Sequence, residues 1–197
     1  DLTKLQNSIS EKERLNTKIK ANNEAQILWY DSIPRKTEYS ILYLHGWSAS
    51  HEEGAPLHRE LGQRYGANVY LPRLEGHGIQ EEQAMLHLTA TDYFESAKEA
   101  LAVAKQIGDK VIVMGTSTGG TLALYLAQGD KDIAGLLLYS PNIRIYDPSA
   151  FLLSGPWGLE IAKTIMDSDF YESEADSLKR SYWTTKYRVE ALTQLQA

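Results

Sequence analysis

The sequence has no cysteine, so disulfides, thiolate catalysis and cysteine-rich zinc sites are all excluded. It has no basic excess either, because 20 Lys and Arg stand against 26 Asp and Glu, for a net charge of −6. A nucleic-acid partner is therefore not expected, since phosphates must be neutralised by basic side chains. No apolar run approaches the roughly 18 residues that span a bilayer, so we expect no transmembrane segment. The histidines lack the paired spacing of metal ligands, and we expect neither a metal nor another cofactor.

The central part of the chain alternates between two kinds of apolar pattern. Its 197 residues suffice for one domain with a hydrophobic core. Short apolar runs predict strands at 25–30, 39–44, 69–71, 111–114 and 133–139. Helical patterns lie at 92–107, with Thr91 as the expected N-cap, and at 119–128. This alternation predicts an α/β fold with a mostly parallel sheet and helices on both faces.

The two ends of the chain differ from this central part, 25–145. Residues 1–24 are polar, with apolar side chains at a loose helical spacing, and we interpret them as an N-terminal arm or peripheral helix. Residues 146–197 are interpreted as a helical cap or lid, with helices at 157–166 and 177–195 and no buried strand. This last part is rich in aromatic residues, namely Phe151, Trp157, Phe170, Tyr171, Tyr182, Trp183 and Tyr187.

A serine flanked by glycines stands directly after the strand at 111–114 and directly before a helix. The segment Gly115-Thr-Ser117-Thr-Gly119-Gly120 matches G-x-S-x-G, in which the chain turns from strand to helix at the serine. The residues two before and two after the serine approach too closely for side chains, which explains both glycines. The turn exposes the Ser117 hydroxyl, and the helix N-terminus favours an oxyanion beside it. A plain glycine-rich or phosphate-binding turn is the alternative, although the absence of a following lysine excludes a Walker loop.

A second short motif, His45-Gly46-Trp47, follows the strand at 39–44. An oxyanion hole uses the backbone N–H of the residue after the nucleophile, here Thr118, and a second N–H from the loop after a neighbouring strand. The Trp47 N–H fits that second position. For His45 we expect a hydrogen bond that fixes the loop and no part in proton transfer.

Taken together, these motifs resemble the α/β-hydrolase superfamily, in particular its monoacylglycerol lipase and carboxylesterase-like members. The matching segments are His45-Gly46, Leu71-Pro-Arg-Leu-Glu-Gly76-His77-Gly78, the 115–120 motif, and Ser140-Pro141, where the cap of that family departs. The resemblance implies that Ser117 is the nucleophile and that the N–H groups of Trp47 and Thr118 form the oxyanion hole. It also implies supporting roles for His45, Gly46, Gly115 and Gly119, and a structural turn at Gly76-His77-Gly78.

The sequence departs from the family pattern after Ser117. The order of the triad in this fold is serine, acid, histidine, yet all five histidines precede the serine: His45, His51, His58, His77 and His87. The family motif assigns none of them as the base. Asp147 is a candidate acid, with a solvated turn carboxylate as the alternative. We expect the acid, the histidine and the last two strands beyond Ala197; a hydrolase-like fold that has lost its triad is the other interpretation.

Three functions are consistent with these motifs and with the absence of a histidine after Ser117. The leading hypothesis is a serine hydrolase that cleaves small-molecule carboxylic esters through an acyl-enzyme on Ser117, and the aromatic cap suits an apolar acyl group. An acyltransferase, or an amide or lactone hydrolase, would use the same site. A non-catalytic binding module on a degenerate hydrolase fold is the third. The glutamate pairs at 52–53 and 81–82 are interpreted as solvated charges.

Overall fold

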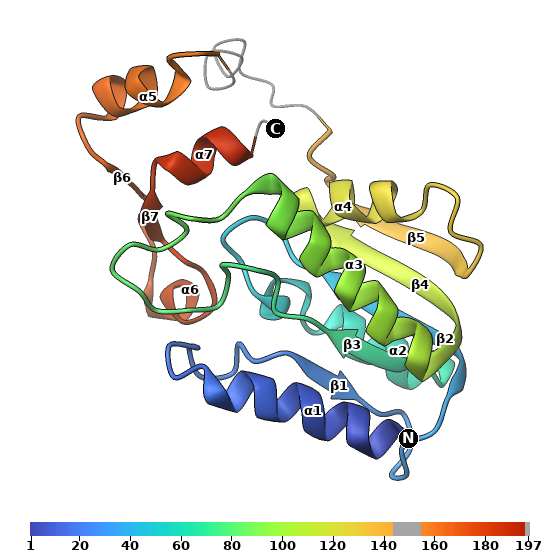
Figure 1. The fold of residues 1–197 in the computed structure, drawn as a ribbon. Helices are drawn as coiled ribbons and strands as arrows, with labels where there is room; N and C mark the ends of the chain where they lie inside the picture. The colour runs from blue at the N-terminus through green and yellow to red at the C-terminus, as the bar shows by residue number, and fades with distance from the viewer. Residues whose placement is uncertain (144–154, 196–197) are drawn as a thin grey trace.

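The computed structural model describes residues 1–143 and 155–195, which contain a central five-stranded sheet (Figure 1). The strand order is β1-β3-β2-β4-β5, and every neighbouring pair is parallel except β1 with β3. The strands are β1 (Gln26–Leu28), β2 (Thr37–Leu44), β3 (Asn68–Leu71), β4 (Gly108–Thr116) and β5 (Ile133–Tyr139). The predicted α/β class with a mostly parallel sheet is thus confirmed.

The two central strands, β2 and β4, bring the two sequence motifs together. The last five residues of β2 are all buried, as expected for a parallel strand covered on both faces. In the register of the pair, Leu44 lies opposite Gly115. Because both strands end at the same edge of the sheet, the loop that starts at His45 and the turn at Ser117 leave it side by side.

Helices cover both faces of the sheet. Helices α3 (Ala90–Ile107) and α4 (Thr118–Leu126) pack on one face with Leu42 and Leu44 of β2. Helix α2 (Leu57–Tyr65) packs on the other face, with Ile41 and Tyr43, and is preceded by the short 3₁₀ helix η1 (His51–Gly54). No helix in the described part of the chain is long and apolar enough to cross a bilayer.

The N-cap of α3 differs from the sequence-based prediction. The cap is Thr89 rather than Thr91: its Oγ1 accepts a hydrogen bond from the Asp92 N–H at 3.1 Å and donates to the Asp92 carboxylate at 2.6 Å. Both threonines are good capping residues, but only Thr89 is followed three residues later by an acidic side chain, which accepts a hydrogen bond from the threonine hydroxyl.

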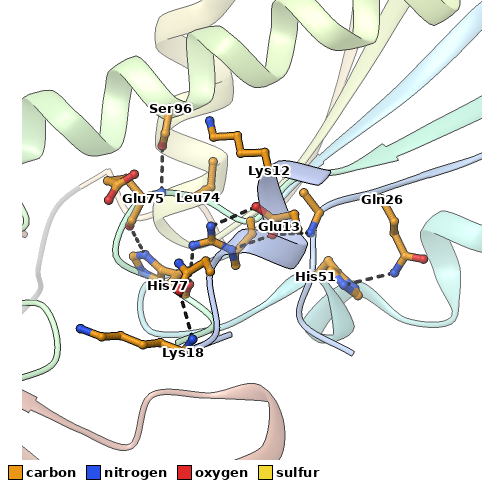
Figure 2. Close-up of polar contacts among 12 residues, drawn as sticks. Lys12, Glu13, Lys18, Gln26, His51, Leu74, Glu75, His77 and Ser96 are labelled. Carbon is orange, nitrogen blue, oxygen red and sulfur yellow. Dashed lines mark hydrogen bonds and ion pairs between the residues drawn. The ribbon is translucent and has the colours of Figure 1, made fainter. Parts of the chain in front are cut away.

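The N-terminal helix α1 (Leu2–Leu15) lies beside β1 and is held by a buried ion pair (Figures 1 and 2). Glu13 is only 6% exposed, and its two carboxylate oxygens accept hydrogen bonds from Arg73 at 2.8 and 3.0 Å. The same carboxylate accepts the Ala25 N–H at 2.9 Å. Arg73 also donates to the His77 carbonyl at 3.3 Å, so the pair connects α1 to the 71–78 loop.

The C-terminal described part is composed of short elements. They are α5 (Gly158–Met166), β6 (Phe170–Glu172), α6 (Ser177–Tyr182), β7 (Lys186–Arg188) and α7 (Glu190–Gln194). The prediction of one helix over 177–195 is wrong, because this stretch contains the strand β7, which pairs with β6. Tyr187 is the one buried residue of these two strands. The Trp-Thr-Thr run that starts at Trp183 favours extended backbone over helix, which explains the break.

The C-terminal elements contact the sheet domain through backbone hydrogen bonds. The Thr184 N–H donates to the Ser48 carbonyl at 2.7 Å, and the Arg188 N–H donates to the Ala84 carbonyl at 3.0 Å. Gln194 of α7 accepts the Ala90 N–H at the start of α3, at 3.1 Å. These contacts place the C-terminal elements beside the edge of the sheet from which both motifs emerge.

Candidate active site

Ser117 occupies a strained turn between β4 and α4. Its φ of 53° and ψ of −119° lie outside the regions that residues with a side chain normally adopt. Backbone hydrogen bonds hold the turn: the Ser117 N–H donates to the Tyr139 carbonyl at 2.9 Å, and the Ser117 carbonyl accepts from Gly120 and Asn142, both at 3.0 Å. The neighbouring strand and the start of α4 therefore stabilise a conformation that costs free energy.

The flanking glycines are required by close backbone approach. A Cβ on Gly115 would lie 2.5 Å from the Gly119 carbonyl oxygen, and a Cβ on Gly119 would lie 2.0 Å from the Leu44 carbonyl oxygen. Both distances are shorter than any real contact of a Cβ with oxygen. The strand-to-helix turn and its contact with the end of β2 thus depend on glycine at both positions.

His45 holds the loop after β2 in place. Its Nε2 accepts the Leu74 N–H at 3.2 Å, so the proton is on Nδ1, which donates to the Gly46 carbonyl at 3.0 Å. The imidazole is fully buried, and burial lowers its pKa well below the usual value. The ring is therefore neutral, and both of its nitrogens are occupied by backbone groups.

The two N–H groups expected to form the oxyanion hole are unoccupied within the described residues. Neither the Trp47 nor the Thr118 backbone N–H donates to any acceptor in residues 1–143 and 155–195. Gly46, which precedes Trp47, packs against the nucleophile turn, because a Cβ placed on it would lie 3.2 Å from the Ser117 Cβ. Two donors that have no acceptor among the described residues, next to the Ser117 hydroxyl, suit the binding of an oxygen with developing negative charge.

An apolar cavity of about 320 Å³ lies between α3 and α4 next to these donors. Trp47, Tyr93, Phe94, Thr118, Leu122 and Tyr125 are among the residues that line it. Gln194 and Leu195, at the end of the described chain, contribute to another wall. The lining is mostly hydrocarbon and aromatic, which suits an apolar ligand group.

Tyr93 and His77 support the loop from the side of α3. Tyr93 is buried, and its hydroxyl donates to the His45 carbonyl at 3.2 Å. His77 stacks on Tyr93 and contacts the Trp47 ring edge to face, with its Nδ1 bonded to the Glu75 carbonyl at 2.7 Å (Figure 2 shows His77 and Glu75). Phe94, the next residue of α3, is only partly buried and lines the cavity.

The interpretation of Glu53 as a solvated charge is wrong. Its Oε2 accepts hydrogen bonds from the Gly46 N–H at 2.7 Å and from the Tyr43 hydroxyl at 3.1 Å. The side chain is half-buried, and this burial raises the pKa of the carboxyl group. The neighbouring Glu52 does pair with a surface cation, Arg59. The two glutamates are adjacent, so nothing in the local sequence indicates which of them contacts the loop after β2.

The remaining histidines contact groups other than Ser117 or are exposed to solvent. The His58 Nε2 is bonded to the His51 carbonyl at 2.8 Å, the His51 Nε2 contacts the Gln26 amide nitrogen at 3.3 Å, and His87 is exposed. Figure 2 shows His51 and Gln26 on the side of α1, with their contact drawn as a dashed line.

The rest of a catalytic triad has no counterpart in the described part of the chain. Within residues 1–143 and 155–195 the Ser117 Oγ makes no hydrogen bond. Asp147, the candidate acid, lies outside the described residues. The described residues also contain no group of three side chains suited to hold a metal ion.

Comparison with known proteins gives consistent matches. Residues 41–194 match the model of the alpha/beta hydrolase family. A thermostable monoacylglycerol lipase from Bacillus sp. (strain H-257) is 38% identical over 115 residues, which cover 58% of this chain and 45% of that lipase. The aligned region therefore spans less than half the length of this relative.

Solved structures with similar folds include two that are named as lipolytic or lipase-related. A structure of the metagenome-derived lipolytic enzymes LipS and LipT superposes with a TM-score of 0.67 at 21% identity, covering 90% of this chain and 68% of that one. A lipase-esterase related protein from Clostridium acetobutylicum gives a TM-score of 0.55 at 14% identity, over 88% and 70%. At such identities the likeness is one of fold.

Proposed function

Because the chain belongs to the alpha/beta hydrolase family, we propose that its protein is a serine hydrolase that cleaves carboxylic esters through an acyl-enzyme on Ser117. One observation carries the proposal: a strained serine sits at the end of β4, next to an apolar cavity and to two backbone N–H groups that have no acceptor among the described residues. Backbone strain of this kind clusters at active sites and ligand-binding sites, where the surrounding structure maintains it.

The proposed reaction follows from this arrangement. The Ser117 Oγ attacks the acyl carbonyl carbon, and its proton passes to a general base while the carbonyl oxygen becomes an oxyanion. The N–H groups of Trp47 and Thr118 donate to that oxyanion. The carbon–oxygen bond to the alcohol then breaks, the alcohol leaves with the proton, and water hydrolyses the acyl-enzyme to release the acid. The base and its acid partner are proposed to come from residues outside the described part of the chain.

The substrate class rests on the cavity. Its volume of about 320 Å³ and its aromatic and aliphatic lining suit an apolar acyl group next to the oxyanion donors. The matched Bacillus protein is a monoacylglycerol lipase, which supports a monoacylglycerol-type ester as the substrate proposed here. The cavity ends against Gln194 and Leu195, so α7 is proposed to form part of the acyl site.

The test is active-site labelling of the full-length protein with a fluorophosphonate probe, read by peptide mass spectrometry. We expect one adduct, on Ser117, and turnover of p-nitrophenyl esters that Ser117→Ala abolishes. Gly135→Ala, a substitution on β5 away from the turn, should retain both. Absence of an adduct on folded protein would instead favour a non-catalytic binding module. Product analysis with water and glycerol as competing acceptors separates hydrolysis from acyl transfer.

A further inference from the structure

Hydrogen bonds from three side chains fix two successive peptide groups of the loop after β2. In the peptide between His45 and Gly46, the carbonyl accepts the Tyr93 hydroxyl at 3.2 Å and the N–H donates to the Glu53 Oε2 at 2.7 Å. In the next peptide, between Gly46 and Trp47, the carbonyl accepts the His45 Nδ1–H at 3.0 Å. Three side chains, from α3, from η1 and from the loop itself, thus converge on a short piece of backbone.

These contacts set the direction of the proposed oxyanion donor. In a trans peptide the C=O and N–H point in opposite directions, so a fixed Gly46 carbonyl also fixes the Trp47 N–H. Gly46 has no side chain to restrict rotation, and the orientation of its two peptides depends on what holds them. The shortest of the three contacts is the one from the Gly46 N–H to Glu53.

Glu53 also connects this loop to the nucleophile turn. Its Oε2 accepts the Tyr43 hydroxyl at 3.1 Å, and the same hydroxyl lies 3.0 Å from the Oγ1 of Thr116, the residue before Ser117. A Cβ placed on Gly46 would lie 3.0 Å from the Glu53 Oε1 and 3.2 Å from the Ser117 Cβ. The carboxyl group therefore lies beside both parts of the candidate active site.

We propose that Glu53 is a positioning residue for the oxyanion hole, which it serves by accepting the Gly46 N–H and so aligning the Trp47 N–H. The proposal rests on the acyl-enzyme function proposed above. The role is that of a hydrogen-bond acceptor and not of a charge. A carboxylate anion beside Ser117 would repel the oxyanion that forms there, whereas a neutral acceptor would not.

The distinguishing experiment compares Glu53→Gln, Glu53→Asp and Glu53→Ala in the full-length protein. Gln keeps an acceptor of the same length that cannot ionise, Asp keeps an ionisable carboxyl group but withdraws the acceptor by one methylene, and Ala removes both. Glu52→Ala is the matched control, because Glu52 is on the same short helix η1 and pairs with Arg59 at the surface. The measurements are kcat and KM on a p-nitrophenyl ester, and the rate of fluorophosphonate labelling at Ser117.

We expect Glu53→Ala and Glu53→Asp to lose about 10- to 100-fold in kcat and in labelling rate, with KM within about threefold of the wild type. Glu53→Gln should stay within about threefold of the wild-type kcat, because the acceptor that aligns the donor remains. Glu52→Ala should leave both parameters unchanged. A purely structural role would lower the yield of folded protein without this split between Gln and Asp.

Two results would overturn the role of Glu53 while leaving the proposed function intact. One is a labelled wild type whose Glu53→Ala variant reacts equally fast; the other is a Glu53→Gln variant as impaired as Glu53→Asp. If Glu53→Ala does not fold, the comparison of Gln with Asp decides the matter alone. A wild type with no adduct on Ser117 is a different result, and it overturns the proposed function itself.

Discussion

The imidazole of His77 stacks on the phenol ring of Tyr93, with ring centroids 4.9 Å apart and 24° between the planes. The turn at 76–78 and helix α3 thereby support each other, and through the Tyr93 hydroxyl they hold the His45 carbonyl. Because His77 is fully buried, a protonated ring would lose its hydration, which disfavours the charged form. This burial gives stability a dependence on pH.

Burial lowers the pKa of His77 to about 4, from an unfolded value of about 6.5. Between these values the unfolded chain binds a proton that the folded chain does not, so stability is fully present above pH 6.5 and falls as the pH drops toward 4. We expect this residue alone to lower the free energy of unfolding by about 2 kcal/mol between pH 7 and pH 5. Urea denaturation at the two pH values measures it.

The variant for this prediction is His77→Phe, which keeps the stacked ring and removes the proton site. Its loss of stability between pH 7 and pH 5 should be smaller than that of the wild type by about 2 kcal/mol. His87→Phe, at an exposed histidine, should leave the wild-type difference unchanged. Equal differences in wild type and His77→Phe would contradict the prediction.

Gly119→Ala should destabilise the protein by about 3 kcal/mol or more, because the new Cβ would lie 2.0 Å from the Leu44 carbonyl oxygen and backbone must move. The matched control is Gly135→Ala in β5, where the nearest atom is the Ile112 Cδ1 at 3.4 Å. That control should change stability by less than about 0.5 kcal/mol. Chemical denaturation of both variants is the measurement, and a Gly119→Ala variant of wild-type stability would show that the turn relaxes.

Ala90→Phe should shorten the acyl chain that the protein prefers, because Ala90 lines the cavity at the start of α3. Each methylene that loses its apolar contact costs about 0.8 kcal/mol. We expect kcat/KM for a p-nitrophenyl octanoate to fall at least about tenfold relative to the acetate. Ala102→Phe, at an exposed position of the same helix, should leave this ratio unchanged. An unchanged ratio in Ala90→Phe would place the acyl group elsewhere.

Glu13→Ala should lower the free energy of unfolding by about 3 kcal/mol, since it leaves Arg73 largely buried without its partner. Glu13→Gln keeps the acceptor for Arg73 and for the Ala25 N–H, so it should cost less. Glu11→Ala, on the exposed face of α1, is the control and should be close to neutral. Urea denaturation at pH 7 separates the three, and a Glu13→Ala midpoint equal to that of the control would show that α1 does not stabilise the domain.

Local patterns predicted most of the fold. Each of the five apolar runs is a strand of the central sheet, since a buried parallel strand is apolar whichever partner it has. The turn at Ser117 was visible for the same reason, because two glycines at fixed offsets report a steric requirement within one segment. The helix expected at 177–195 failed because its periodicity is equally compatible with short elements, and the pairing of β7 with β6 decided between them.

The sequence by itself determined the α/β class, the five strands of the central sheet and the turn at Ser117, because these depend on backbone sterics and on hydrophobic periodicity along neighbouring residues. Only the tertiary structure decided that Glu53 lies against Gly46 while Glu52 faces Arg59, and that Tyr93 holds the His45 carbonyl. Such contacts join residues from separate elements. They depend on the register of β2 against β4 and on the packing of α3 and η1 beside them, which no local pattern of residues specifies.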